Sequence, residues 1–139
     1  MGLIQKLAVW TGIFLVLSGC SLGGEPSITV KGVTIVASDA IKGSASSFLY
    51  IINDGRGSDK LVGCSVKEFP EVYVDLHDSV RGQMVIVKEI EAPARKTTAL
   101  ERGGLHIMFD GFPEVPGDEV TLILNFLKSG PIEAKATVL

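Results

Sequence analysis

Residues 105–109 read Leu-His-Ile-Met-Phe, in which aliphatic or aromatic residues alternate with a histidine and a methionine. Such alternation is typical of a β-strand, because successive side chains of a strand point to opposite faces of the sheet. The first, third and fifth residues are therefore expected to face the core. His106 and Met108 are expected to share the outward face, close enough together to bind one atom.

Similar short runs recur through the rest of the chain, separated by turn residues such as Asn53-Asp54-Gly55. They cover residues 28–30, 33–36, 47–52, 61–66, 72–77, 84–90, 97–100, 105–109, 120–127 and 132–138. No stretch after residue 26 has a convincing helical period. About seven to nine short strands in roughly 110 residues predict an all-β domain, with a Greek-key β-sandwich as the favoured architecture.

The length and composition limit the protein to a few classes. A chain of 139 residues has room for one ordinary domain, and 46% hydrophobic residues are enough for a real core. Only 2 Cys are present, which excludes a disulfide-rich scaffold. The formal net charge of -3 gives no basic face, so nucleic acid is not expected as a partner.

The first 20 residues have the pattern of an export signal rather than of a folded element. The apolar run 7–17 is too short to span a bilayer comfortably. It ends in Leu-Ser-Gly-Cys at 17–20, which resembles the bacterial lipobox, whose cysteine is lipidated and becomes the first mature residue. Residues 1–20 are therefore interpreted as a lipoprotein signal peptide with Cys20 as the lipidation site. An ordinary secretory signal and an uncleaved anchor are the alternatives.

A lipidated Cys20 would hold the protein on a membrane outside the cytoplasm, in the periplasm of a Gram-negative host. Ser21 after the cysteine, rather than Asp, favours the outer membrane in an enterobacterium-like host. Residues 21–26 are small and Gly-rich and end in Pro26, so we expect a short flexible tether. The folded domain is then expected to cover residues 27–139.

The rarest side chains of the domain are gathered in one part of the sequence. Both histidines and both methionines after the initiator lie between positions 77 and 108, as His77, Met84, His106 and Met108. Alternation in residues 72–77 places His77 on the outward face. Arg81-Gly82 can form a turn, so His77 and Met84 are expected near the tip of one hairpin.

Imidazole and thioether together form a soft-to-borderline ligand set that suits Cu(I) and is poor for calcium or magnesium. Thioethers also remain neutral ligands outside the cytoplasm, where thiols tend to be oxidised. Because the imidazole must be neutral to bind, copper affinity is expected to fall below a pH of about 6.5. The pattern by itself leaves open that the methionines only fill the core and that the histidines are incidental.

The order of these residues resembles the PCuAC-type periplasmic copper chaperones, whose signature is a His, a Met, a spacer of twenty-one residues and a His-x-Met triplet. Here the signature reads His77, Met84, twenty-one residues and His106-Ile107-Met108. The surroundings are also similar to segments of that family, at residues 61–63, 74–77, 90–94, 103–108 and 120–126.

The resemblance implies a cupredoxin-like β-sandwich that binds Cu(I) through the four residues. It also implies a partner, a copper-acceptor protein, typically the dinuclear copper centre of cytochrome c oxidase, sometimes with a second assembly factor. Transfer by ligand exchange requires no catalytic turnover, so the protein is not expected to be an enzyme. The hairpin between His77 and Met84 is about four residues shorter than is usual in the family, and no Met-rich tail is present for a second copper ion.

Two other functions remain open from the sequence. One is a lipid-anchored β-sandwich adaptor that binds a protein partner without metal. The other is a copper redox protein, but a blue-copper site needs a Cys thiolate beside two His. Cys64 alternates with Val62 and Val66 and is expected to be a small buried residue, so no intense blue colour is expected with Cu(II).

Overall fold

The computed structural model describes residues 23–139, so the signal segment and Cys20 lie outside the described residues. The described residues form ten β-strands and no helix, which confirms the all-β prediction. None of their elements is a helix able to cross a membrane. The strands are β1 (Ile28–Ala37), β2 (Ser44–Asn53), β3 (Asp59–Val66), β4 (Tyr73–Val80), β5 (Gln83–Val87), β6 (Ile90–Ala92), β7 (Lys96–Leu100), β8 (His106–Asp110), β9 (Glu119–Phe126) and β10 (Gly130–Val138).

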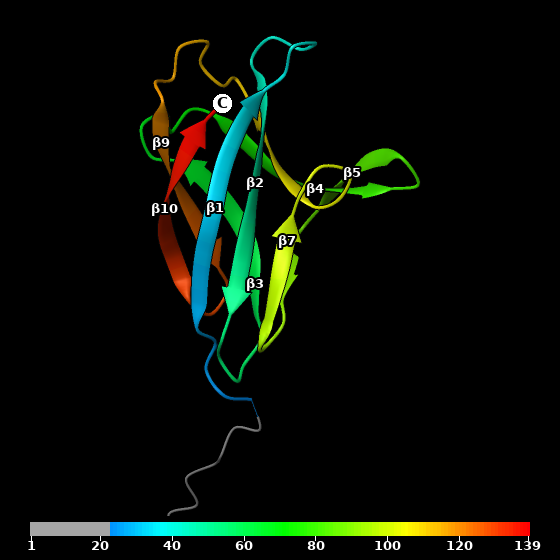
Figure 1. Cartoon of the computed structure of the whole chain (residues 1–139), viewed down its shortest axis with the longest axis vertical. Helices are drawn as coiled ribbons and strands as arrows, with labels where there is room; N and C mark the ends of the chain where they lie inside the picture. The colour runs from blue at the N-terminus through cyan, green and yellow to red at the C-terminus, as the bar shows by residue number, and fades with distance from the viewer. Residues whose placement is uncertain (1–22) are drawn as a thin grey trace, which may run out of the picture.

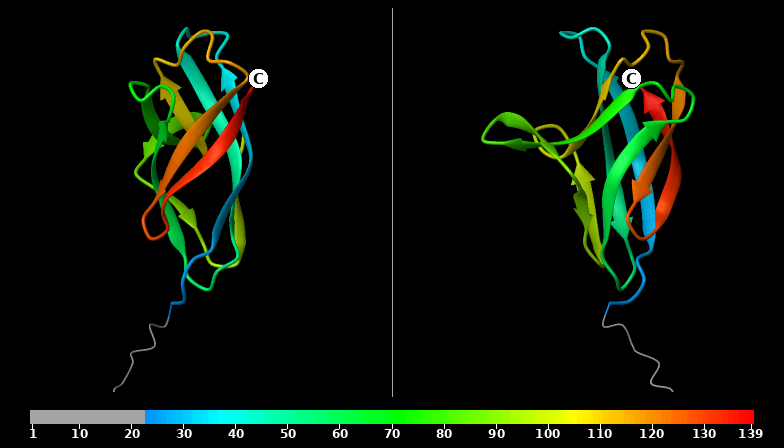
Figure 2. Two further views of the ribbon diagram at one scale, coloured as in Figure 1. Left: turned by 90° about the vertical axis from the view of Figure 1, so that its left-hand side faces the viewer. Right: turned by 180° about the vertical axis from the view of Figure 1, so that it is seen from behind.

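All ten strands belong to one curled sheet that wraps around the core (Figure 1). The strand order is β5-β4-β8-β2-β1-β10-β9-β3-β6, with β7 also paired to β2. Neighbours are antiparallel except for β1 and β10, which pair in parallel over a short stretch near residues 34–35 and 137–138. The hairpin of β4 and β5 lies at one end of this order and stands out from the barrel (Figure 2).

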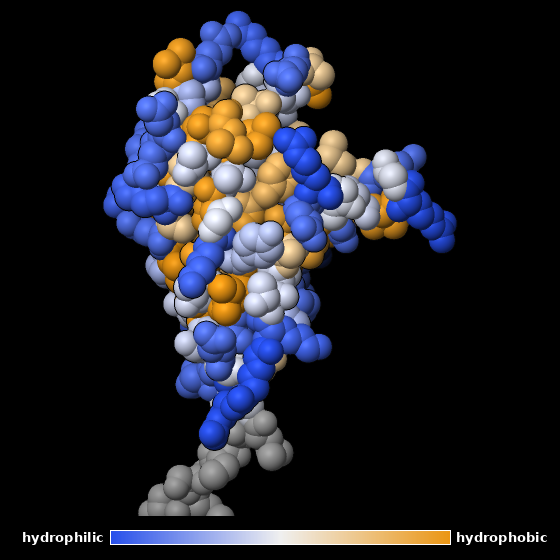
Figure 3. All heavy atoms as spheres, in the orientation of Figure 1, coloured by the Kyte–Doolittle hydropathy of each residue, from blue (hydrophilic) through white to orange (hydrophobic). Residues whose placement is uncertain are grey.

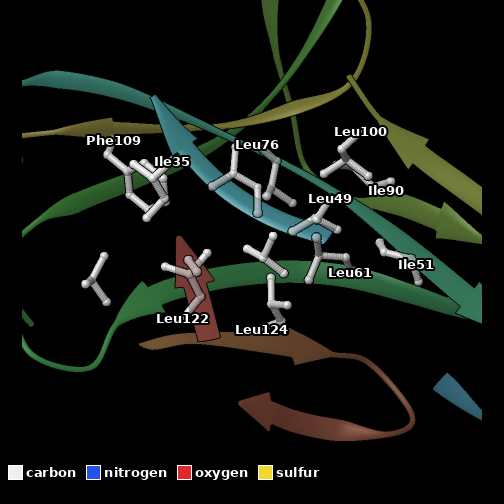
Figure 4. Packing of buried hydrophobic residues seen from close by; sticks show 14 of the residues in the cluster. Ile35, Leu49, Ile51, Leu61, Leu76, Ile90, Leu100, Phe109, Leu122 and Leu124 are labelled. Atoms are coloured by element: carbon white, nitrogen blue, oxygen red, sulfur yellow. The ribbon is translucent and has the colours of Figure 1, made fainter. Parts of the chain in front are cut away.

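The core fills the inside of the curled sheet with apolar side chains, mostly aliphatic, from strands that are distant in sequence (Figure 4). Ile35, Leu49, Leu61, Phe109 and Leu122 are all essentially inaccessible to water. Each such side chain contributes about 1.5–3 kcal/mol by leaving water. Ile107 and Phe109 are buried, which confirms two of the inward positions predicted in residues 105–109. Their burial fixes the register of β8, because a shift by one residue would turn both side chains outward.

The sequence suggested two separate runs, one before Gly32 and one after it, but Gly32 does not end a strand. The structure has a single β1, with a register shift against β2 between Lys31 and Thr34. Gly32 lies there with φ of 63°, a left-handed conformation that glycine adopts readily. The glycine therefore makes a bulge and not a break.

The run expected over residues 84–90 is divided between two ends of the sheet. β5 ends at Val87, where it still pairs with β4, whereas Ile90 begins β6 and pairs with Leu61 of β3. Ile90 is buried, and this burial requires the chain to leave the projecting hairpin and return to the core. Apolar character alone could not show this change of partner.

Cys64 and Val62 do not share a face, which corrects the simple alternation. A register shift between Leu61 and Gly63 on β3 leaves Val62 outward and 42% exposed. Cys64 is partly buried and packs against the core. Cys64 is thus the small core residue that was expected. The bulge turns Val62 to the outer face, so the two residues do not share a face.

The chain just before β1 is attached to the turn between β2 and β3. The carbonyl of Glu25 accepts hydrogen bonds from the backbone N–H groups of Arg56 and Gly57, at 3.1 and 3.3 Å. Buried Asn53 supports the same turn by donating to Gly57 O and Ala92 O. The part of the expected tether that the structure describes is therefore fixed to the domain from Glu25 onward.

Candidate metal centre

His77 and His106 lie directly opposite each other on the neighbouring strands β4 and β8. Their ring centroids are 5.4 Å apart, in an edge-to-face arrangement with an interplanar angle of 65°. Asp75 and Met108 form the next pair on the same face, because alternate residues of a strand share a face. The structure thus brings three of the four residues predicted from sequence onto one small area of the sheet.

Met84 reaches the same face through the β4–β5 hairpin. Arg81 and Gly82 form a two-residue turn with φ values of 54° and 77°, both in the left-handed region that a tight hairpin of this type requires. Met84 pairs with Ser79, which lies two residues from His77. The Met84 side chain is 60% exposed, so it is the most accessible of the four.

His106 is covered, although the sequence suggested an open outward position. It is only 5% exposed, and Phe48 of β2 lies beside it with the ring centroids 6.4 Å apart. The Nδ1 atom of His106 is 2.8 Å from the carbonyl oxygen of Gly104. A carbonyl can only accept, so Nδ1 carries a proton, and the tautomer with its lone pair on Nε2 fits this contact.

His77 differs from His106 in its hydrogen bonding. Its Nδ1 atom is buried and has no hydrogen-bond partner among the described residues. Burial lowers the pKa of His77, and the neighbouring His106 lowers it further, while Asp75 partly opposes both effects. A lowered pKa keeps the imidazole neutral at neutral pH, which is the form that binds a metal.

The thioether of Met108 is oriented by a residue of β2. Ser46 pairs with Met108 in the sheet, and its hydroxyl donates to the Met108 sulfur at 3.3 Å. A thioether sulfur has a second lone pair that such a contact leaves available. Ser46 therefore restricts the orientation of Met108 without consuming its capacity as a ligand.

A shallow pocket of about 200 Å³ opens beside Met84 and His106, without His77 or Met108 in its lining. It is lined by Ser46, Phe48, Ser79, Met84, Arg102, Gly103 and His106. The guanidinium of Arg102 lies 5.5 Å from the centroid of the Phe48 ring, in a cation–π contact beside the pocket. Sequence reasoning missed Phe48 and Arg102; alternation in residues 47–52 could have placed Phe48 on the outward face.

The donor set fits a soft cation better than a hard one. Among residues 23–139, no group of three or more His, Cys, Asp or Glu side chains could hold a metal ion. The two imidazoles alone supply two donors, and the two methionine thioethers would bring the number to four. Thioether sulfur favours Cu(I). Cys64 lies on β3, away from β4 and β8 in the sheet order, so it adds no thiolate to this face.

Solved PCuAC domains share this fold. The copper-bound PCuAC domain from PmoF2 is 18% identical, with a TM-score of 0.66 over 82% of this chain and 97% of that one. The apo PCuAC domain from PmoF1 is 20% identical, with a TM-score of 0.66 over 83% and 98%. The solution structure of Cu(I)-DR1885 from Deinococcus radiodurans is 22% identical, with a TM-score of 0.62 over 86% and 82%.

These likenesses confirm the cupredoxin-like β-fold that the resemblance implied. No curated protein matches the sequence. The sequence does match one family profile, described as "Putative lipoprotein LpqE-like", over residues 28–138. This range begins with the first residue of β1 and ends with the last residue of β10. Because the match spans every strand of the domain, the chain belongs to the LpqE-like family.

Proposed function

We propose that this protein is an extracytoplasmic Cu(I) chaperone whose ligands are His77, Met84, His106 and Met108. The observation that carries the proposal is the cross-strand pair of His77 and His106, with both methionines on the same sheet face. The likeness of the fold to PCuAC domains, two of them solved with copper, supports the same function.

The proposed site suits transfer of the ion better than storage. Two imidazoles and two thioethers are neutral, so they leave the charge of Cu(I) uncompensated. His106 and Met108 are anchored by Gly104 O and Ser46, whereas Met84 lies exposed on the hairpin. An acceptor can therefore displace Met84 first and take the ion by ligand exchange. Only metal–ligand bonds change, and no covalent bond of the protein is altered.

Attachment to a membrane through lipidated Cys20 belongs to the same proposal. The family description names a lipoprotein, which supports an anchored protein in the periplasm. An anchor restricts the domain to the membrane surface, where a membrane-bound acceptor would be found. The acceptor we propose is the dinuclear copper centre of cytochrome c oxidase or one of its assembly factors.

The test is a competition for Cu(I) between the full chain and a chromogenic chelator. The double variant Met84→Leu/Met108→Leu keeps side-chain size and removes both sulfurs, and it should lose at least about tenfold in affinity. Leu127→Ala, an exposed apolar change on the β9–β10 turn, is the matched control and should bind like the wild type.

One outcome would transfer support to another function. If the double variant competes for Cu(I) as well as the wild type does, the methionines are not ligands, and the metal-free adaptor becomes the better interpretation. A second readout is the spectrum with Cu(II): without a thiolate at the site, no intense blue absorption is expected.

A further inference from the structure

The strand β5 is an open edge of the sheet. It is the first strand in the sheet order and pairs only with β4 among the described strands. Its sequence, Gln-Met-Val-Ile-Val, contains no charge and no proline, and its register with β4 has no bulge. Charges, prolines and bulges are the usual features that keep an edge strand from pairing with another chain.

The opposite edge of the sheet is protected by contrast. β6 has three residues, and two of them, Ile90 and Ala92, are buried. Its central residue Glu91 lies 3.4 Å from the ammonium group of Lys60 in an ion pair. A short, charged and inward-packed strand offers little to a second chain, so of the two ends of the strand order β5 is the open one.

The backbone groups of β5 that face away from β4 can be identified from the register. Val80 and Gln83 close the two-residue hairpin, and the closing pair of such a hairpin exchanges hydrogen bonds. Alternate residues then point their N–H and C=O groups outward, which on β5 are Met84 and Ile86. Two donors and two acceptors are therefore available along this edge.

The side chains of β5 are also apolar and accessible on both faces. Met84 and Ile86 are 60% and 68% exposed on the face of His77, and Val85 is 39% exposed on the other. The hairpin stands away from the barrel, and apolar atoms lie along it behind a hydrophilic tip (Figure 3). A second strand can approach this edge without meeting the body of the domain.

We propose that β5 pairs with β5 of a second copy of this chain, antiparallel and centred on Val85. In this register Met84 of each copy lies opposite Ile86 of the other, so the outward backbone groups make four hydrogen bonds. The arrangement is isologous, since the same edge serves both copies. No charged residues face each other within the paired strands.

This self-association goes beyond copper binding and does not depend on it. It has one consequence for the proposed site, because Met84 would lie beside an Ile86 side chain contributed by the second copy. That contact would remove part of the Met84 thioether from water. Pairing would therefore cover the most exposed of the proposed ligands.

The register can be tested by disulfide cross-linking of the full chain in detergent. In the proposed pairing the two Val85 residues form a non-hydrogen-bonded pair with Cα atoms about 4.5 Å apart, within the range of a disulfide. Val85→Cys should give a covalent dimer under mild oxidation. Val80→Cys, on β4 of the same hairpin, is the matched control and should stay monomeric, as should the wild-type chain.

Two further variants test whether the edge itself is responsible. Ile86→Pro removes an outward N–H without removing a bond to β4, and Ile86→Lys adds a charge to the interface; either change, combined with Val85→Cys, should abolish the covalent dimer. Leu127→Lys with Val85→Cys should leave it unchanged. An unchanged thermal midpoint shows that each variant is folded. Equal cross-linking of Val80→Cys and Val85→Cys, no cross-linking of Val85→Cys, or a dimer that persists in both folded Ile86 variants would overturn the proposal.

Discussion

His77 and His106 are direct cross-strand partners, yet their two rings are held in different ways. Nδ1 of His106 is hydrogen-bonded to Gly104 O at 2.8 Å, and this ring is almost completely buried. Nδ1 of His77 has no partner within residues 23–139, and this ring is only half-buried. One of the two proposed ligands thus also contributes to the fold, whereas the other has no hydrogen bond at Nδ1 for a ligand to displace.

Alanine substitutions should separate these two roles. His106→Ala removes a buried ring beside Phe48 and leaves Gly104 O unpaired, so it should lower the free energy of unfolding by about 1–3 kcal/mol. His77→Ala should change that free energy by less than about 1 kcal/mol, because no hydrogen bond of Nδ1 is lost. Urea denaturation of the two variants beside the wild type measures the difference. Equal losses would show that the hydrogen bond to Gly104 does not distinguish the two rings.

A substitution in the turn between β4 and β5 should raise the stability of the domain. Arg81 adopts φ of 54°, which disfavours most side chains but suits asparagine, and Gly82 already follows it. Arg81→Asn should therefore stabilise the domain by about 0.5–1 kcal/mol, seen as a rise in thermal midpoint. Gly82→Val, which forces a β-branched residue to φ of 77°, should lower the midpoint and serves as the opposite control.

Asp59 should give the domain part of its resistance to acid. The residue is only 1% exposed and accepts hydrogen bonds from Lys60 N, Lys128 N and both the N–H and the hydroxyl of Ser129. Burial raises the pKa of Asp59, but these hydrogen bonds outweigh it, so the pKa lies below the ordinary value of 3.8. The carboxylate therefore stabilises the fold above that value, and its contribution is lost as the pH falls through the folded-state pKa.

Asp59→Asn should cost about 1–3 kcal/mol at neutral pH, because its NH₂ group would face donors on the turn. The difference from the wild type should shrink at pH values below about 3.8. Denaturant unfolding at a series of pH values measures this. A difference that does not change with pH would mean that the charge of Asp59 is not responsible.

Cys64, the single cysteine of the described residues, should react slowly with thiol reagents. Burial raises the pKa of the Cys64 thiol to about 12, so almost no thiolate is present near neutral pH. Alkylation of Cys64 should therefore be slow in the native protein and fast in denaturant, as followed by mass spectrometry. Cys64→Ala should keep the full copper stoichiometry; loss of the bound equivalent would place the thiol at the site.

Local patterns in the sequence predicted the all-β character and the approximate positions of the strands, and they singled out the residues of the candidate site. Alternation in residues 105–109 predicted which side chains of β8 share a face, and the pairing of β8 with β4 agrees. Arg81-Gly82 predicted the hairpin that carries Met84. These features depend on a period of two and on turn chemistry, both of which act between residues that are close in sequence.

Only the tertiary structure decided what surrounds those residues. The pairing of β8 with β2 places Phe48 and Ser46 beside His106 and Met108, and it buries a histidine that alternation alone suggested was open. Bulges at Gly32 and Val62 likewise depend on the partner strand. Periodicity tells which side of a strand a residue occupies, but pairing between distant segments determines which strand lies next to it. The open edge of β5 has the same origin, since a strand is an edge only when no other segment pairs with it.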